Sequence, residues 1–258
     1  MPGLTVSLVQ AAASLDPAEN RAALDVVADV AGGSDLVVFP EAFMRGFGES
    51  GADVAKFAEP LDGPFVTRLA ELAQAHDVTL LAGMFETSDD PERPYNTLVL
   101  VDGDGLRTSY RKIHLYDSFG YRESERLTAG ALEPVVAEVG GFKVGLMTCY
   151  DLRFPELARA LVDQGAELLV VPSAWVAGPG KVHHWRTLVT ARAIENTVYL
   201  AAAGQPGPRY TGHSMVVAPD GDVLVEAGEG ACVVDARLER DVLDKTRATN
   251  PSLANRRM

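Results

Sequence analysis

The hydrophobic positions along the chain follow two alternating patterns. Short continuous apolar runs, typical of strands buried on both faces, alternate with longer segments whose apolar residues recur every three to four positions, as in amphipathic helices. The first unit comprises a strand at 4–11, a helix at 17–33 and a strand at 35–41. Asp16 and Pro17 suit the N-cap and first turn of that helix. The beginning of the chain therefore predicts a β-α-β unit.

The same alternation continues toward the C-terminal end. The remaining predicted elements are helices at 63–76 and 154–166, strands at 78–86, 142–148 and 167–173, two strands around a Gly-Asp-Gly turn within 96–112, a helix followed by a strand within 183–204, and three short strands within 213–236. Buried strands that alternate with helices indicate an α/β layered sandwich, and the hairpins make its sheets mixed. Because no repeat or linker interrupts the pattern, we expect residues 1–258 to form a single domain.

Composition and charge exclude several classes of protein. Hydrophobic residues make up 47% and charged residues 23%, which is ordinary for a folded protein. The formal net charge of −13 argues against nucleic acid or an anionic membrane as a partner, because both would repel the chain. No apolar stretch is long enough to cross a bilayer, and the N-terminus has no leader-like segment. We therefore expect a cytoplasmic protein.

The chain has only two cysteines, Cys149 and Cys232, and they are too few for a disulfide scaffold. They form no C-x-x-C pair that would indicate zinc or a redox dithiol, so free thiols are expected. The adjacent His183 and His184 lack a third ligand at metal spacing. The sequence therefore predicts neither a metal site nor a cofactor.

Three polar residues follow apolar strands directly. Glu41 follows the strand that contains Leu-Val-Val-Phe-Pro, Lys112 follows the strand around Ser109, and Cys149 follows the strand at 142–148. In α/β folds, ligands collect outside the carboxyl ends of the strands. An acid, an amine and a thiol could thus converge on one pocket.

These three side chains could form a nucleophilic site. A protonated thiol becomes a useful nucleophile when a cation stabilises the thiolate or a carboxylate accepts its proton. Lys112 could supply the cation and Glu41 the base. After attack on an amide carbonyl, the Lys112 ammonium and the backbone N–H of Tyr150 could hold the oxyanion. Glu41 could then protonate the departing ammonia and activate the hydrolytic water.

The residues taken by themselves leave other interpretations open. Cys149 could be inert core packing, Glu41 could cap a helix or turn, and Lys112 could be a solvated strand-end residue. A Cys-His pairing is a further alternative, with His114 or His184 as the most plausible partner of Cys149. Nothing local selects either histidine.

A series of blocks along the chain is similar to the nitrilase superfamily of carbon–nitrogen hydrolases. The resemblance covers nearly the whole chain in order, and six blocks together are far more specific than a lone Glu, Lys or Cys. The blocks are VVFPEAF, YRKIHLYD, YRESERLTAG, GLMTCYDLRFPELAR, HHWRTLVTARAIEN and TGHSMVVAPDGDVL.

The resemblance implies a four-layer α-β-β-α sandwich with two mixed β-sheets. It implies Glu41 as general base, Lys112 as the group that stabilises the tetrahedral intermediate, and Cys149 as the nucleophile that forms a thioester. Glu123 would be a second active-site glutamate that positions the lysine and the substrate. Members of this family commonly pair through helices on the outer face of the sandwich, so we expect a homodimer.

The segment CYDLRFPE indicates the branch of the family. It resembles the amidase branches that include omega-amidase and deaminated-glutathione amidase, in which Asp151 and Arg153 would fix the nucleophile's loop through hydrogen bonds or an ion pair. We therefore predict an amidase that releases ammonia from a small linear carboxamide. N-carbamoyl amino acid hydrolysis and nitrile hydrolysis stay open, as does a non-catalytic scaffold of the same fold.

Substrate specificity is less well determined by the sequence. An amide that carries a carboxylate would require an uncompensated cation in the pocket. Arg122, Arg153 and Lys181 are the candidates, and the sequence does not place any of them there.

Overall fold

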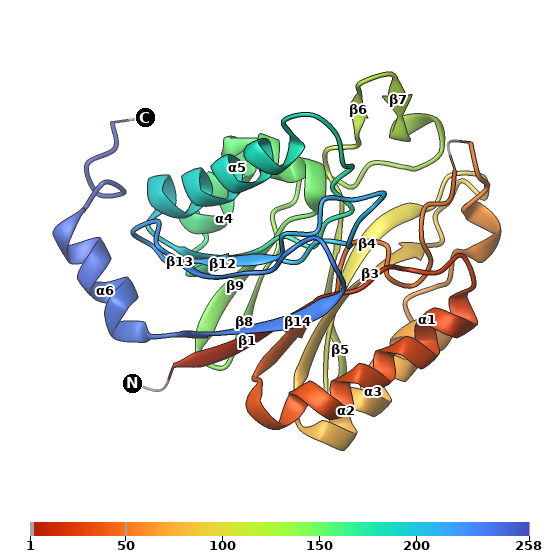
Figure 1. The fold of residues 1–258 in the computed structure, drawn as a ribbon, viewed down its shortest axis with the longest axis horizontal. Coiled ribbons are helices and arrows are strands. Elements are labelled where there is room, and N and C mark those ends of the chain that lie inside the picture. The colour runs from red at the N-terminus through yellow and green to blue at the C-terminus, as the bar shows by residue number, and fades with distance from the viewer. Residues whose placement is uncertain (1–2, 50, 258) are drawn as a thin grey trace.

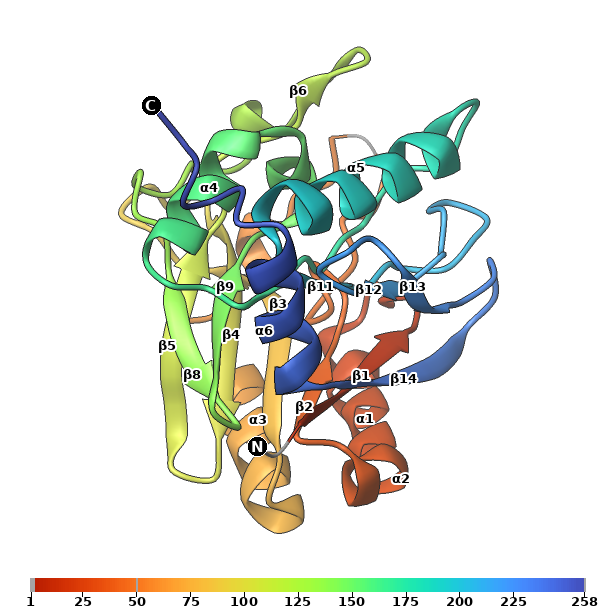
Figure 2. The same cartoon turned by 90° about the vertical axis from the view of Figure 1, so that its left-hand side faces the viewer.

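The computed structural model describes residues 3–49 and 51–257 and arranges them in four layers (Figures 1 and 2). Two six-stranded sheets pack face to face, with helices on both outer faces. The predicted α-β-β-α sandwich with two mixed sheets is confirmed. In the described ranges, no helix is both long and apolar enough to span a bilayer.

The first sheet has the strand order β14-β1-β2-β3-β4-β5. Its strands are β1 (Leu4–Gln10), β2 (Leu36–Val38), β3 (Thr79–Glu86), β4 (Tyr95–Asp102), β5 (Gly105–Arg111) and β14 (Cys232–Leu238). β1, β2 and β3 are parallel to one another, while β4, β5 and β14 join antiparallel. The predicted hairpin around the Gly-Asp-Gly turn is β4-β5.

The second sheet repeats this plan with the order β13-β12-β11-β10-β9-β8. Its strands are β8 (Val136–Val139), β9 (Phe142–Leu146), β10 (Leu168–Val170), β11 (Tyr199–Ala202), β12 (Met215–Val217) and β13 (Val223–Glu226). Again three central strands, β9 to β11, are parallel and the flanking strands are antiparallel. A small separate hairpin consists of β6 (Asp117–Ser118) and β7 (Tyr121–Arg122). The hydrophobic pattern of the sequence predicts neither this hairpin nor β8.

All the described helices but the last cover the outer faces of the sheets, and the last lies at one end of the sandwich (Figures 1 and 2). They are α1 (Pro17–Ala23), α2 (Val27–Val30), α3 (Pro64–His76), α4 (Pro155–Asp163), α5 (Lys181–Asn196) and α6 (Arg240–Thr249). The helix predicted at 17–33 is found with Asp16 as its N-cap, but 3₁₀ turns at Leu24–Val26 and Ala31–Gly33 divide it. Closely spaced β-branched valines and two final glycines lower the helix propensity of this segment.

The alternation of side chains along the strands produces the layers. On β2, Leu36 and Val38 belong to the core between the sheets, together with Val144 of β9. Val37, between them, points to the opposite face and packs in the helix-covered core with Leu69 of α3. Successive strand residues point to opposite faces, so one short apolar run contributes to two cores.

Two of the strands end earlier than predicted, and the turns that follow them carry residues of the candidate site. β2 ends three residues before Glu41, and β9 ends three residues before Cys149. Both functional candidates therefore lie in turns beyond the strand ends, where the backbone no longer follows the sheet. Cys149 opens a 3₁₀ turn at Cys149–Arg153 that leads into α4.

Candidate active site

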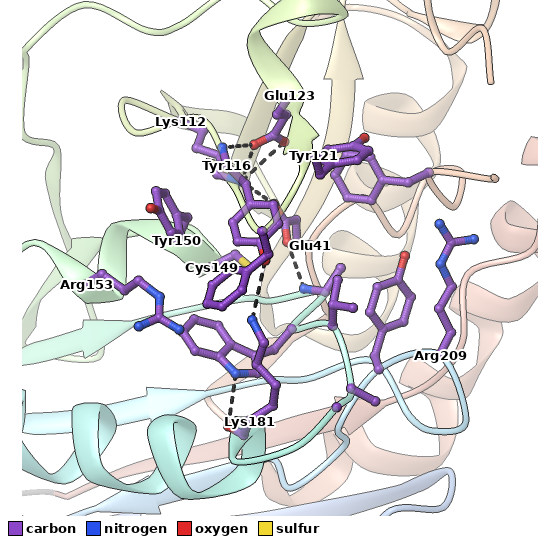
Figure 3. A pocket seen from close by; sticks show the side chains of 18 of the residues that line it. Glu41, Lys112, Tyr116, Tyr121, Glu123, Cys149, Tyr150, Arg153, Lys181 and Arg209 are labelled. Atoms are coloured by element: carbon purple, nitrogen blue, oxygen red, sulfur yellow. Dashed lines mark hydrogen bonds and ion pairs between the residues drawn. The ribbon is translucent and has the colours of Figure 1, made fainter. Parts of the chain in front are cut away.

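The residues predicted at three strand ends converge on one pocket of about 440 Å³ (Figure 3). Glu41 follows β2, Lys112 follows β5, and Cys149 follows β9. Glu123, expected only from the family resemblance, lines the same pocket from a 3₁₀ turn after β7. All four are buried, with Glu41 only 1% and Lys112 only 2% exposed.

The ammonium of Lys112 lies between two carboxylates. Its Nζ is 2.9 Å from Glu41 Oε1, 2.9 Å from Glu123 Oε2 and 3.2 Å from Glu123 Oε1. Burial opposes the charge of Lys112, but the carboxylates of Glu123 and Glu41 outweigh it, and they raise the pKa of the ammonium well above its usual value. The lysine is therefore a fixed cation at neutral pH.

Glu41 is held by a set of neutral donors. Asn96 donates from Nδ2 to Oε1 at 2.8 Å, and the backbone N–H of Ala174 donates to Oε2 at 2.7 Å. Gln205 fixes the backbone, because its Nε2 donates to the carbonyl oxygen of Glu41 at 2.9 Å. These contacts leave the carboxylate little freedom to rotate.

Sequence reasoning missed Asn96, which also reaches Glu123 Oε1 at 3.4 Å. It lies in β4, fully buried, between Tyr95 and Thr97 and just before the apolar run that ends at Val101. An amide inside an otherwise apolar strand requires hydrogen-bond partners, and this was the signal available in the sequence. Glu123 has one more donor, the backbone N–H of Tyr116, at 2.6 Å from Oε2.

The Cys149 thiol lines the same buried pocket as the Glu41 carboxylate. Burial, and next the negative charge of Glu41, raise the pKa of the thiol well above its usual value, although Lys112 acts in the opposite direction. Two carboxylates and one ammonium already leave the site with a net negative charge, so a resting thiolate is disfavoured. The geometry therefore supports a neutral thiol beside a carboxylate that can accept its proton.

The backbone at Cys149 is strained. Its φ of +48° lies in the left-handed region, which a residue with a Cβ rarely adopts. Its N–H donates to the carbonyl oxygen of Pro172 at 3.0 Å. This conformation turns the chain sharply and presents the thiol to the pocket.

Asp151 holds this turn, as expected from its position in CYDLRFPE. Its fully buried carboxylate accepts hydrogen bonds from Thr148 N at 2.8 Å and from Tyr110 Oη at 2.7 Å. His114 contributes its backbone N–H at 3.1 Å and places Nδ1 2.7 Å from the same carboxylate. The His114 ring also stacks on Phe154, with 3.7 Å between the ring centroids.

The alternative Cys-His pairing gains no support from these contacts. The His114 side chain faces Asp151 and Phe154, and neither His114 nor His184 is among the described residues that line the pocket. Within residues 3–49 and 51–257, no group of three or more His, Cys, Asp or Glu side chains could hold a metal ion.

The three residues considered as cations for a substrate carboxylate lie in different places. Arg122 is exposed and lies 3.6 Å from Glu125, whereas Arg153 and Lys181 both line the pocket. Arg153 makes a cation–π contact, with its guanidinium 4.8 Å from the Trp175 ring centroid. Tyr150, the predicted source of an oxyanion donor, follows Cys149 directly and also lines the pocket.

A two-sheet sandwich that buries a thiol, an ammonium and two carboxylates in one pocket defines a hydrolase of carbon–nitrogen bonds. The sequence model of the carbon-nitrogen hydrolase family matches residues 5–248. The chain belongs to this family, and it acts on non-peptide carbon–nitrogen bonds.

Relatives of the chain include named amidases. It is 41% identical over 222 residues to the deaminated glutathione amidase of Escherichia coli O157:H7, covering 86% of this chain and 84% of that protein. A solved CN-hydrolase superfamily protein of Xanthomonas campestris, which carries an arsenic adduct in its active site, has a TM-score of 0.90 at 30% identity and covers 100% of this chain and 98% of its own.

A third relative bears on the chemistry. The amidase of Nesterenkonia sp. AN1 has a TM-score of 0.83 at 29% identity, with 98% of this chain and 94% of that chain covered. One variant of that protein shows covalent addition of the acetamide moiety of fluoroacetamide at its active-site cysteine.

Proposed function

We propose that the protein is a thiol-dependent amidase, which hydrolyses a small linear carboxamide to a carboxylic acid and ammonia through a thioester on Cys149. One observation carries the proposal: the Cys149 thiol lines the same pocket as the Glu41 carboxylate, which is 2.9 Å from the Lys112 ammonium. Nucleophile, base and cation thus lie in one pocket before substrate arrives.

In the first half of the reaction, Glu41 takes the proton of the thiol as sulfur attacks the amide carbon. The carbonyl oxygen becomes an oxyanion, which the Lys112 ammonium and the backbone N–H of Tyr150 stabilise. Glu41 then gives its proton to the nitrogen, the carbon–nitrogen bond breaks, and ammonia leaves. The acyl group remains on the sulfur of Cys149.

In the second half, a water molecule takes the place of ammonia. Glu41 accepts one proton from the water as its oxygen attacks the thioester carbon, and the same two donors hold the new oxyanion. When the carbon–sulfur bond breaks, the proton returns to sulfur and the carboxylic acid leaves. The starting state of Glu41 and Cys149 is thereby restored.

Glu123 acts as a positioning residue in this scheme. It contacts Lys112 through both carboxylate oxygens and is itself held by Tyr116 N. If Glu41 alone held the lysine, the ammonium could move each time Glu41 gains or loses a proton. Two carboxylates and Asn96 fix the ammonium where charge develops, which is the basis of electrostatic preorganisation.

The test is a panel of small amides, nitriles and N-carbamoyl compounds assayed for ammonia release. We expect the amides to be the best substrates, and a mass increase of one acyl group on the Cys149 peptide after rapid acid quench. Cys149→Ala abolishes both signals, and Cys232→Ala, which alters the other free cysteine, is the matched control. A preference for nitriles or N-carbamoyl compounds would place the protein in another branch of the family. If none of the compounds releases ammonia, a non-catalytic scaffold would be favoured.

Separate substitutions distinguish the proposed site from a Cys-His pair. Lys112→Ala is expected to abolish ammonia release, whereas His184→Ala keeps most of it, because His184 does not line the pocket. Loss of turnover with the histidine change alone would contradict the assignment of Lys112.

We also propose a cytoplasmic homodimer that pairs through the outer faces of α4 and α5. Ile194 at the end of α5 is 44% exposed, and Val223 on β13 is 49% exposed. Ile194 lies against Gly221, just before β13. Light scattering should report twice the chain mass, and Ile194→Asp should shift it to a monomer. A monomeric wild-type protein would contradict this pairing.

A further inference from the structure

The two oxygens of the Glu41 carboxylate have different surroundings. Oε1 accepts hydrogen bonds from side chains of the first sheet, at 2.9 Å from Lys112 Nζ after β5 and at 2.8 Å from Asn96 Nδ2 in β4. Oε2 accepts one from the second sheet, at 2.7 Å from the backbone N–H of Ala174 beyond β10. The carboxylate of Glu41 therefore joins the two sheets, with one oxygen bonded to each.

The donors decide which oxygen is open to a proton. Each carboxylate oxygen has about two lone-pair sites. Both sites of Oε1 are occupied, whereas Oε2 has a single donor among the described residues and keeps one site free. A proton on Oε1 would also lie beside the Lys112 ammonium, whose positive charge opposes it. Oε2 is thus the more favourable position for a proton.

The segment that bonds to Oε2 also holds the turn of the nucleophile. The N–H of Cys149 donates to the carbonyl oxygen of Pro172 at 3.0 Å, and Ala174, which bonds to Oε2, is two residues further on. Cys149 follows β9, and β9 lies parallel to β10 in the second sheet. Glu41 and Cys149 line the same pocket (Figure 3). The open oxygen is therefore the one bonded to the sheet that carries the thiol.

Asn96 keeps the two oxygens different. Its Nδ2 donates to Glu41 Oε1 at 2.8 Å and to Glu123 Oε1 at 3.4 Å. Its Oδ1 is shielded from solvent and has no hydrogen-bond partner in the described part of the chain. Turning the amide over would point Oδ1 at two carboxylates, so repulsion keeps Nδ2 toward them. Because a buried carbonyl without a partner is unfavourable, the role of this amide lies in the contacts of its Nδ2.

We propose that Asn96 is a positioning residue that keeps Oε1 of Glu41 occupied, so that Oε2 takes the proton of the Cys149 thiol. This inference rests on the proposed amidase function and assigns its first proton transfer to one atom. The S–H bond breaks, an O–H bond forms on Oε2, and the electron pair left on sulfur attacks the amide carbon. The Ala174 N–H keeps the other lone-pair site of Oε2, so the carboxyl group stays oriented to return the proton to the leaving nitrogen.

The turnover experiment uses Asn96→Leu, which removes the donor and keeps the branched shape of the side chain. We expect kcat for a small amide to fall by roughly 10- to 100-fold while KM changes less than about threefold, because the base loses its orientation. The acidic limb of kcat/KM against pH should move to higher pH, since the ionised carboxylate of Glu41 loses a donor. A loss confined to KM would contradict the proposal.

Thr97→Val is the matched control, because it also removes a buried hydrogen bond from β4. Thr97 is fully buried and donates to Glu86 Oε2 at 2.8 Å, and neither residue is among those described as lining the pocket. This variant should keep both kcat and the acidic limb of the wild-type protein. Asn96→Ser, a smaller change, should show the same pH shift if Asn96→Leu does not fold, as judged by circular dichroism. Equal behaviour of the Asn96 and Thr97 variants would overturn the inference.

A thiol-labelling experiment keeps this inference separate from the proposed function. Alkylation of Cys149 by iodoacetamide requires loss of the thiol proton but no amide hydrolysis, and peptide mass measures its rate with Cys232 as internal reference. The acidic limb of the Cys149 rate should move to higher pH in Asn96→Leu and stay in place in Thr97→Val. That result supports the inference even if no amide is hydrolysed. Identical profiles for Asn96→Leu and the wild-type protein overturn it, while ammonia release by the wild-type protein would leave the amidase proposal standing.

Discussion

Two parts of the pocket each contain a lysine, one buried and one half-buried. Among the described residues, only the buried lysine has carboxylate partners that balance its charge. Lys112 is enclosed by Glu41 and Glu123, whose carboxylates balance the charge of its ammonium. Lys181 rests on aromatic rings beside another cation. A charge satisfied within the fold is part of preorganised machinery, whereas a charge left unsatisfied is available to a ligand. Matched substitutions at the two lysines test this distinction directly.

The largest effect is expected for Lys112→Met. It removes the cation from between two buried carboxylates, so we expect a loss of stability of roughly 3 kcal/mol, partly relieved by proton uptake. Ammonia release should fall by roughly 10³-fold or more, because the oxyanion loses its charged partner. Chemical denaturation and steady-state assays measure the two quantities. A stable variant that retains most of its activity would show that Lys112 is not central to the site.

Glu41→Gln should separate the two roles of that carboxylate. Turnover falls by roughly 10²- to 10⁴-fold because the base is lost. The thiol pKa falls as well, because the negative charge of Glu41 raises it in the wild-type protein. A pH titration of thiolate absorbance near 240 nm, taken as a difference from Cys149→Ser, should therefore shift to lower pH in Glu41→Gln and to higher pH in Lys112→Met. Shifts in the same direction would contradict this electrostatic account.

Gly83→Ala tests how tightly the backbone holds Glu41. A Cβ at Gly83 of β3 would lie 2.4 Å from Ala42 N and 2.9 Å from Glu41 Cα, so the turn must move. Ala42 already has a strained φ of +53°. We expect a destabilisation of about 1–3 kcal/mol and a roughly 10-fold or greater loss in kcat. Gly103→Ala, whose added Cβ would make only ordinary contact, is the control. Equal behaviour of the two variants would refute the proposed constraint.

How much the sequence could predict differs between these features. Glu41, Lys112 and Cys149 could be predicted because the hydrophobic runs end there, and the carboxyl ends of β2 and β5 in one sheet and of β9 in the other meet at one pocket. Asn96 was missed because it lies inside a strand, where periodicity describes burial and says nothing of hydrogen bonding. The fold followed from runs of buried residues, whereas the small β6-β7 hairpin has too few apolar positions to form a recognisable pattern.

The charge pattern of the pocket was less accessible to sequence reasoning. Arg122, Arg153 and Lys181 were equivalent candidates in the sequence, and only three-dimensional packing puts Arg122 at the surface beside Glu125. Whether a cation is paired depends on contacts between residues far apart in the chain, as with Lys181 and Tyr116. No local pattern encodes such contacts.

The smallest effect is expected for Lys181→Met, and it is the sharpest test of the comparison. Methionine can occupy the same aromatic surface near Phe119, and the change removes a cation that is repelled by Arg153. The free energy of unfolding should therefore change by less than about 1 kcal/mol, in either direction. Denaturation in parallel with Lys112→Met, and with Lys56→Met as the surface control, measures this difference. A loss as large as that of Lys112→Met would mean that Lys181 serves the fold rather than a ligand, and the two lysines would no longer differ in kind.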